Sequence, residues 1–244
     1  YPGVFFSQFT GAELVAEKWN LSREDLDEFA LESHQKAANA TESKYFDREI
    51  LPVEGKNAEG INELVLADEG IRFDASLDKL AGLKPVTDGG VITAGNASQI
   101  TDGAAAVMIC NDAGLKKIQS NPRAEIVSIS VVGDDPVFML TGPIPASKKA
   151  LEAAGLSIDD MDLYEVNEAF APVPLAWAHD LEADKSKLNV NGGAMALGHP
   201  LGATGAKLMT TMLHELERRN GNYALQAICE GGGTANATII KRLS

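Results

Sequence analysis

The sequence predicts an α/β layered fold preceded by a less regular region, and three observations support this organisation. From about residue 93 onward, apolar runs typical of strands alternate with stretches of helical periodicity. The length of 244 residues and the hydrophobic content of 45% are enough to build a sizeable core. Residues 1–93 differ, because polar turns separate only a few recognisable elements there. We therefore expect a less regular region before the layered part.

The first region carries one strong helix signal. Ser22 offers a hydroxyl N-cap, and Glu24 and Asp25 place acidic groups in the first turn of a helix. Apolar residues at helical spacing continue this pattern to about residue 40. The other elements expected in this region are a short strand over 50–53 and a short helix near 76–80.

Beyond residue 93, strands are expected where apolar and β-branched residues run together. Residues 103–110 form a continuous apolar run, which is typical of a strand buried on both faces. Asn111 or Asp112 can cap a short helix behind that strand. The stretch 204–219 predicts an amphipathic helix that ends near Gly221. The remaining expected elements are strands over 125–133, 162–166, 188–191, 223–229 and 234–240, a helix over 147–154 that stops at Gly155, and helical residues 167–171.

Composition excludes several classes of partner and location. The 21 basic and 35 acidic residues give a formal net charge of −14, which argues against binding to nucleic acid or to anionic lipid. Two cysteines, Cys110 and Cys229, are too few for a disulfide scaffold, so a reducing, cytoplasmic location is expected. No apolar run approaches the roughly 18 residues that a membrane span needs.

Three segments place chemically useful side chains at strand ends, where α/β sheets hold their ligands. Asn167 follows an expected strand, His199 lies in a loop with five glycines between residues 192 and 205, and Cys229 precedes three glycines. Taken singly, an Asn there is usually a helix N-cap, such a Cys is usually core packing, and such glycines usually form a hairpin. A phosphate at the helix start near Thr204 is a further alternative. Together, however, the three segments favour proton transfer and polarisation of a substrate.

Metal binding is not expected at these segments. One Cys and one His are fewer than the three or four ligands that a metal site requires. The glycine-rich loop also lacks the Gly-Lys-Ser/Thr ending of a P-loop and the spacing of a dinucleotide fingerprint.

The three segments resemble the C-terminal signatures of the thiolase family, in the same order along the chain. A thiolase-like fold implies a layered α/β architecture with a mixed sheet and helices on both faces, incomplete in this chain. It also implies an inserted loop domain over 1–93, the last strand and helix of the N-terminal half over 94–120, and the C-terminal half over 121–244. The matching stretches are Asn167-Glu168-Ala169-Phe170, Gly198-His199-Pro200-Leu201-Gly202 and Cys229-Glu230-Gly231-Gly232-Gly233, and residues 94–98 with 102–105 resemble a further block.

Enzymes of this family transfer acyl groups between coenzyme A thioesters. They cleave a 3-ketoacyl-CoA with CoA or run the reverse Claisen condensation of acetyl-CoA. The resemblance implies that Cys229 is the acid/base at the acetyl α-carbon, with a pKa expected near the working pH. It implies that His199 activates the nucleophilic thiol and donates to a thioester oxygen, and that Asn167 holds a water at that oxygen.

The resemblance also implies binding roles for three further residues. The backbone N–H of Gly231 is expected in a second oxyanion hole, where each lost donor typically costs about 2.7–4 kcal/mol. Arg72 and Ser98 match positions that contact CoA in the family. At residues 7–10, Ser7-Gln8-Phe9-Thr10 replaces a stretch in which many thiolases carry a His or Met over the CoA chain. This replacement leaves the acyl specificity open.

Several expectations concern the protein as a whole. The resemblance implies CoA as a substrate without a tightly bound cofactor, a place in fatty acid metabolism, and a homodimer or homotetramer. The family's nucleophilic cysteine lies in an N-terminal segment that precedes anything present here. Neither Cys110, expected inside an apolar strand, nor Cys229 can replace it. Residues 1–244 alone are therefore expected to be inactive.

Two other classes compete with a thiolase. A condensing enzyme of the ketosynthase type would not use Cys229 and usually carries a His at the position of Asn167. A thiolase-like protein that carries CoA or lipid without catalysis would not need the three side chains together. The presence of Asn167, His199 and Cys229 in one chain favours the thiolase.

Overall fold

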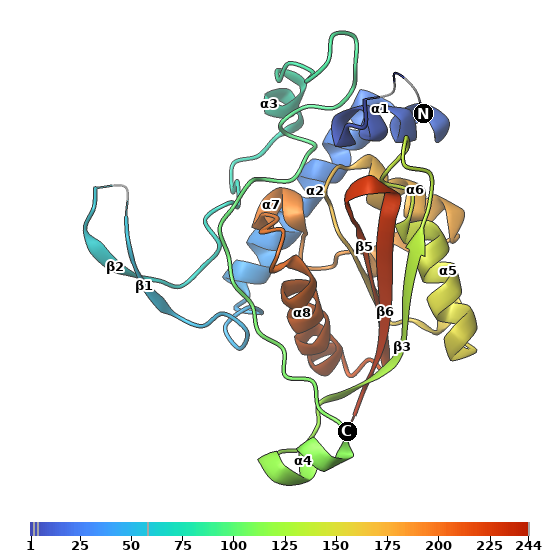
Figure 1. Ribbon diagram of the computed structural model, residues 1–244. Coiled ribbons are helices and arrows are strands. Elements are labelled where there is room, and N and C mark those ends of the chain that lie inside the picture. Colours follow the sequence, from blue (N-terminus) through green and yellow to red (C-terminus); the bar gives the residue numbers. More distant parts are fainter. Residues whose placement is uncertain (2, 4, 58, 244) are drawn as a thin grey trace.

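The computed structural model describes residues 1, 3, 5–57 and 59–243. Its centre is a four-stranded mixed sheet in the order β3-β6-β5-β4 (Figure 1). β4 and β5 run parallel, whereas β6 is antiparallel to both of its neighbours. The strands are β3 (Ala124–Gly133), β4 (Leu163–Val166), β5 (Tyr223–Cys229) and β6 (Thr234–Arg242).

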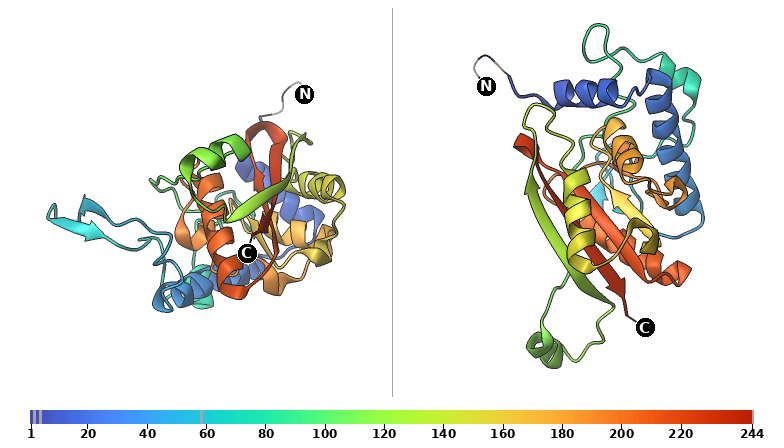
Figure 2. Two further views of the ribbon diagram at one scale, coloured as in Figure 1. Left: turned by 90° about the horizontal axis from the view of Figure 1, so that it is seen from below. Right: turned by 90° about the vertical axis from the view of Figure 1, so that its right-hand side faces the viewer.

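Helices cover both faces of this sheet. α5 (Pro143–Ala154) contacts β3 and β6, and α8 (Thr204–Arg219) packs against β4 and β5. Alternation along β5 explains this, because Leu225 belongs to the core cluster on the α5 side while Ala224 packs with residues of α8. Viewed from below in Figure 2, the sheet lies between the two helices. The predicted mixed sheet with helices on both faces is thus confirmed.

The first region is mostly helical and irregular. α2 (Arg23–Glu42) begins at a capping box in which Ser22 and Asp25 bond each other's backbone N–H, as the sequence predicted. The β1–β2 hairpin projects away from the body of the molecule (Figure 1). The other elements of this region are α1 (Gln8–Lys18), β1 (Val53–Lys56), β2 (Asn62–Val65) and α3 (Leu77–Ala81).

Short elements complete the layered part. Asn111 caps α4 (Asp112–Ile118) by accepting from the backbone N–H of Gly114, as predicted. The glycines after β5 form a 3-10 turn, η3 (Gly231–Gly233). None of the described helices combines the length and the apolar character that a bilayer crossing requires. The remaining elements are α6 (Pro172–Asp180), α7 (Ala194–Leu197), η1 (Ile158–Asp160) and η2 (Lys185–Lys187).

The strand predicted over 103–110 is wrong. These residues have no regular structure and are exposed; Met108, for example, is 77% exposed. A strand forms only when its backbone groups bond a neighbouring strand, and no described strand lies beside this segment. Cys110 is accordingly exposed rather than enclosed in a sheet.

Local boundaries were also predicted wrongly at other places. Residues 167–171 are not helical, because α6 begins only at Pro172, whose fixed φ suits the first helical position. Residues 188–191 form isolated bridges instead of a strand. The strand expected over 50–53 starts at Val53, and the helix expected over 147–154 begins four residues earlier at Pro143.

Candidate active site

The site begins where two parallel strands end side by side. Asn167 directly follows β4, and Cys229 is the last residue of β5. Val166 pairs with Ala227, and the backbone N–H of Asn167 donates to the carbonyl oxygen of Ala227 at 3.0 Å. Parallel strands bring their carboxyl ends to one edge of a sheet. This register therefore places Asn167 and Cys229, which are 62 residues apart in sequence, at the same edge.

His199 joins this edge through a direct contact. Its Nε2 lies 3.2 Å from Nδ2 of Asn167, and its Nδ1 lies 2.6 Å from Oγ1 of Thr204. Because the Thr204 hydroxyl donates to the carbonyl oxygen of Pro200 at 3.0 Å, it accepts a hydrogen bond from Nδ1–H. The lone pair of Nε2 then faces the amide of Asn167.

Gly198 allows the chain to present His199 in this position. Its φ is +82°, and an added Cβ would lie 2.4 Å from Oγ1 of Thr101. A residue with a side chain would be both strained and too close here. The glycine-rich loop is therefore used for close backbone packing before His199.

Burial sets the protonation of both titratable groups. Burial lowers the pKa of His199, so the imidazole is neutral near pH 7 and can accept a proton. Burial raises the pKa of the Cys229 thiol to about 12, which keeps it protonated. This value is well above the near-neutral one that the sequence led us to expect. Cys229 therefore carries its proton at neutral pH.

Residues 96–99 join the two loops of the site. The backbone N–H of Ser98 donates to the carbonyl oxygen of Ala169 at 3.0 Å, and that of His199 donates to the carbonyl oxygen of Gln99 at 3.1 Å. The Gln99 side chain also donates to the carbonyl oxygen of Met195 at 2.7 Å. Ser98 thus lies beside the turn that carries Asn167. The resemblance of residues 94–98 to a family block pointed to this segment, although Gln99 was not singled out.

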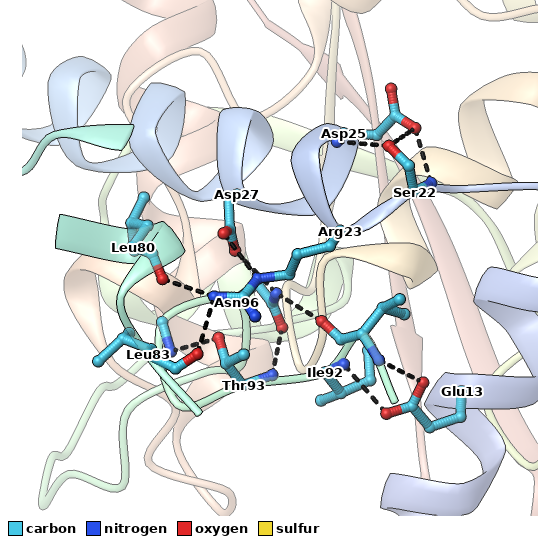
Figure 3. Close-up of polar contacts among 12 residues, drawn as sticks. Glu13, Ser22, Arg23, Asp25, Asp27, Leu80, Leu83, Ile92, Thr93 and Asn96 are labelled. Atoms are coloured by element: carbon cyan, nitrogen blue, oxygen red, sulfur yellow. Dashed lines mark hydrogen bonds and ion pairs between the residues drawn. The ribbon is translucent and has the colours of Figure 1, made fainter. Parts of the chain in front are cut away.

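Asn96 anchors this segment to α2. Its Nδ2 donates to Oδ1 of Asp27 at 3.0 Å, and its Oδ1 accepts from the backbone N–H of Thr93 at 2.8 Å (Figure 3). Asp27 also pairs with Arg23 at 2.6 Å, and Arg23 in turn bonds the carbonyl oxygen of Leu80 (Figure 3). The irregular first region is therefore tied to the site by buried polar contacts.

Gly231 and Arg72 lie at the margins of this arrangement. Gly231 opens the η3 turn directly beyond Cys229, and a Cβ added to it would meet open space. Arg72 exposes its side chain, while its backbone N–H donates to Nδ1 of buried His34 at 3.0 Å. Within the described ranges, no hydrogen bond joins the guanidinium of Arg72 to Asn167 or His199.

Cys110 lies far from this edge. It precedes α4, which Figure 1 shows at the opposite end of the sheet from the β5–β6 turn. The sequence led us to expect that Cys110 cannot replace the nucleophilic cysteine because it would lie inside a strand, whereas the structure leaves Cys110 exposed, directly before α4. Across the described residues, no group of three or more His, Cys, Asp or Glu side chains is arranged to hold a metal ion.

Two buried glutamates lie beside Asn167, and the sequence analysis assigned a role to neither. Glu165 lies in β4 and is fully buried, and neither of its carboxylate oxygens has a partner among the described residues. Burial, together with the nearby charge of Glu168, raises its pKa well above the usual range. Glu168 is 1% exposed, and its carboxylate accepts three hydrogen bonds. A signal was available, because Glu165 interrupts the apolar residues of an expected strand and Glu168 stands in a stretch that resembles a family signature.

Two family models match the chain. The description "Thiolase, N-terminal domain" covers residues 6–113, and "Thiolase, C-terminal domain" covers residues 120–242. A curated relative, the steroid 3-ketoacyl-CoA thiolase FadA6 of Mycobacterium tuberculosis, is 56% identical over 237 residues, which cover 97% of this chain and 57% of the relative.

Solved structures share the fold. The crystal structure of human mitochondrial 3-ketoacyl-CoA thiolase has a TM-score of 0.92 and 46% identity, over 96% of this chain and 59% of that chain. The crystal structure of the same human enzyme in complex with CoA has a TM-score of 0.89 and 45% identity, over 96% and 58% of the two chains. The chain thus spans a little under three fifths of the length of these proteins.

Proposed function

Because this chain belongs to the thiolase family, we propose that the protein transfers acyl groups between coenzyme A thioesters, by thiolytic cleavage of a 3-ketoacyl-CoA or by the reverse Claisen condensation. The observation that carries this proposal is the contact between Asn167 and His199 at the sheet edge that also holds Cys229. A buried amide, a neutral imidazole and a protonated thiol are the groups that a reaction through an enolate requires.

The first half of the reaction breaks the bond between C2 and C3 of the 3-ketoacyl-CoA. Neutral His199 takes the proton of a nucleophilic thiol, and the resulting thiolate attacks C3 to give a tetrahedral alkoxide. The C3 carbonyl then re-forms as the C2–C3 bond breaks. The electron pair of the C2–C3 bond moves to the thioester oxygen as an enolate, which Asn167 and protonated His199 stabilise as donors directly or through water. Cys229 gives its proton to C2, and acetyl-CoA leaves. An acyl thioester and a Cys229 thiolate remain.

The second half returns every proton. The thiol of CoA gives its proton to the Cys229 thiolate, and the CoA thiolate attacks the acyl thioester. This attack gives a second tetrahedral intermediate. The backbone N–H of Gly231, in the turn beyond Cys229, is proposed to donate to its oxygen. The released thiolate then recovers the proton held by His199. Neither cysteine of this chain is the nucleophile in this proposal, so that thiol comes from outside the 244 residues.

Arg72 and Ser98 are proposed to contact CoA. The exposed guanidinium of Arg72 is suited to a phosphate group, with which it can form two hydrogen bonds. Ser98 lies beside Ala169 in the segment that joins the two loops of the site. These positions support a path for CoA that begins at the molecular surface and ends near His199.

The acyl group is proposed to be bulky and apolar. Phe9 packs edge-to-face against Phe170, at 5.4 Å between ring centroids, and Phe170 belongs to the turn that carries Asn167. Phe9 still exposes 38% of its surface, so it can contact a further apolar group. The name of the mycobacterial relative, a steroid 3-ketoacyl-CoA thiolase, supports the same proposal.

A substitution of Phe9 tests the nature of the acyl group. In the protein as its gene encodes it, Phe9→Ala is expected to lower kcat/KM for a ring-bearing 3-ketoacyl-CoA about tenfold, which corresponds to about 1.4 kcal/mol of lost contact. The value for acetoacetyl-CoA, which lacks such a group, should change less than twofold. Equal losses for both substrates would contradict a role of Phe9 in acyl recognition.

The proposed activity is tested by comparing two forms of the protein. The protein as its gene encodes it should show CoA-dependent cleavage of a 3-ketoacyl-CoA, measured by loss of the substrate's enolate absorbance. Residues 1–244 expressed alone should show none, because they offer no second thiol at the site. They should also associate in solution, because β3 leaves Ile129 and Val131 60% and 63% exposed. Turnover by a species with an intact mass of 25.8 kDa would contradict the prediction that residues 1–244 alone are inactive.

Broader features of the protein are proposed on the same basis. The division into a loop domain over 1–93, a piece of the N-terminal half over 94–120 and a C-terminal half over 121–244 is supported by the change from irregular to layered structure. A homodimer or homotetramer is supported by the apolar side chains exposed on β3. A cytoplasmic location is supported by the two unpaired cysteines. CoA serves as a substrate, without a tightly bound cofactor.

A further inference from the structure

Glu168 connects three parts of the chain at one buried carboxylate. Its Oε2 accepts from the hydroxyl of Ser33 in α2 at 2.7 Å and from the backbone N–H of Met195 in α7 at 3.1 Å. Its Oε1 accepts from Nδ2 of Asn189 at 2.9 Å. The carboxylate therefore bonds to α2, to α7 and to the segment that precedes α7, from a position directly after Asn167.

These partners are themselves bonded to the elements that carry the site. The side chain of Asn189 accepts from the backbone N–H of Val166 and donates to its carbonyl oxygen, both at 2.9 Å. It thereby bonds the last residue of β4 as the backbone of a neighbouring strand would. The Ser33 hydroxyl accepts from the backbone N–H of Gly193 at 3.0 Å. Met195 lies in α7, which ends two residues before His199. Glu168 thus links the turn of Asn167 to the segment that leads to His199.

Space around the carboxylate is filled closely. A Cβ added at Gly193 would lie 2.2 Å from the carboxyl carbon of Glu168, so only glycine leaves room for this arrangement. All three contacting groups are donors, which suits an ionised carboxylate; burial raises the pKa of Glu168, and these three bonds lower it and so compensate part of the cost of burial. Glu165, by contrast, is equally buried and has no partner in the described part of the chain.

We propose that Glu168 is a positioning residue for acyl transfer, whose carboxylate holds the Asn167 turn and the His199 segment in register. This inference rests on the proposed function, because it assigns to Asn167 and His199 the stabilisation of the enolate. Glu168 itself contacts no reacting atom. Misplacement of the two site residues should reduce the rate of chemistry more than the binding of CoA, since even small displacements of catalytic groups reduce the rate.

The test replaces Glu168 by its isostere in the protein as its gene encodes it. In Glu168→Gln, whichever way the amide is oriented, its NH₂ group faces a donor from Ser33 and Met195 or from Asn189. We expect kcat for thiolysis to fall 10- to 100-fold while KM for CoA changes less than twofold. Hydrogen–deuterium exchange at C2 of acetyl-CoA, which requires the enolate, should fall in parallel. Gly193→Ala, which crowds the same carboxylate, should reproduce this pattern.

Glu165→Gln is the matched control. It makes the same chemical change at a buried position three residues away that lacks hydrogen-bond partners, and its kcat should stay within twofold of the wild-type value. Rates are normalised to the folded fraction, measured by circular dichroism. A normalised kcat of Glu168→Gln within twofold of wild type, or an equal loss in Glu165→Gln, would overturn the proposal. If Asn167→Ala and His199→Ala also keep full activity, the proposed function itself fails instead.

Discussion

Replacement of Cys229 by alanine is expected to lower the turnover of a 3-ketoacyl-CoA by about 10³-fold, within the range of about 10²–10⁴ that general acid–base catalysis contributes. The thiol stands at the carboxyl end of β5, and burial raises its pKa to about 12, so it is a proton donor at neutral pH. Without it, the enolate formed by cleavage of the C2–C3 bond has no group beside it to protonate C2. The measurement is kcat in the thiolysis assay.

The two half-reactions should respond differently to this substitution. Transfer of an acetyl group from acetyl-CoA to the enzyme needs no proton exchange at carbon, so its rate in Cys229→Ala should stay within about tenfold of wild type. Mass spectrometry of the acyl-enzyme and deuterium exchange at C2 of acetyl-CoA separate the two steps. Cys110→Ala is the matched control, because it removes the exposed cysteine at the other end of the sheet. Near-wild-type rates in both half-reactions of Cys229→Ala would make Cys229 merely structural.

Replacement of His199 by alanine should reduce kcat/KM by about 10²–10⁴-fold, since it removes both a base and a donor to the thioester oxygen. A pH profile identifies the same residue. Burial lowers the pKa of His199 below its usual 6.5, and only the neutral imidazole can accept the proton of a thiol. Activity in the wild type should therefore be full above pH 6.5 and fall as the pH drops through the lowered value. This fall is the acidic limb of the pH profile, and the residual activity of His199→Ala should lack it.

Thr204→Val examines the partner of the imidazole. It removes the hydroxyl that lies 2.6 Å from Nδ1 and leaves a side chain of similar volume. Without this acceptor, the protonated imidazole is less favoured, so the acidic limb should move to still lower pH while the maximal rate changes less than that of His199→Ala. An unchanged acidic limb in both variants would show that another group titrates in the profile.

Elements with complete local signals were predictable from the sequence. α2 begins at a capping box whose hydroxyl and carboxylate lie three residues apart, and α8 carries a continuous apolar stripe, so both were predicted at or within two residues of their observed ends. β5 was predicted over the residues it occupies, because its apolar run is bounded by turn residues. Asn167 and Cys229 could be placed at one edge because parallel strands share the direction in which they end.

The sequence by itself thus determined the fold class, the strongest helices and the strand ends on which the candidate site residues stand. Only the tertiary structure decided which strands pair. Residues 103–110 carry a strand-like run yet remain without regular structure, because ladder hydrogen bonds require a neighbour that a sequence pattern does not specify. The contact of Asn167 with His199 and the three bonds to Glu168 likewise join residues 21–135 positions apart. Such contacts depend on how the loops pack in space, and no local propensity encodes them.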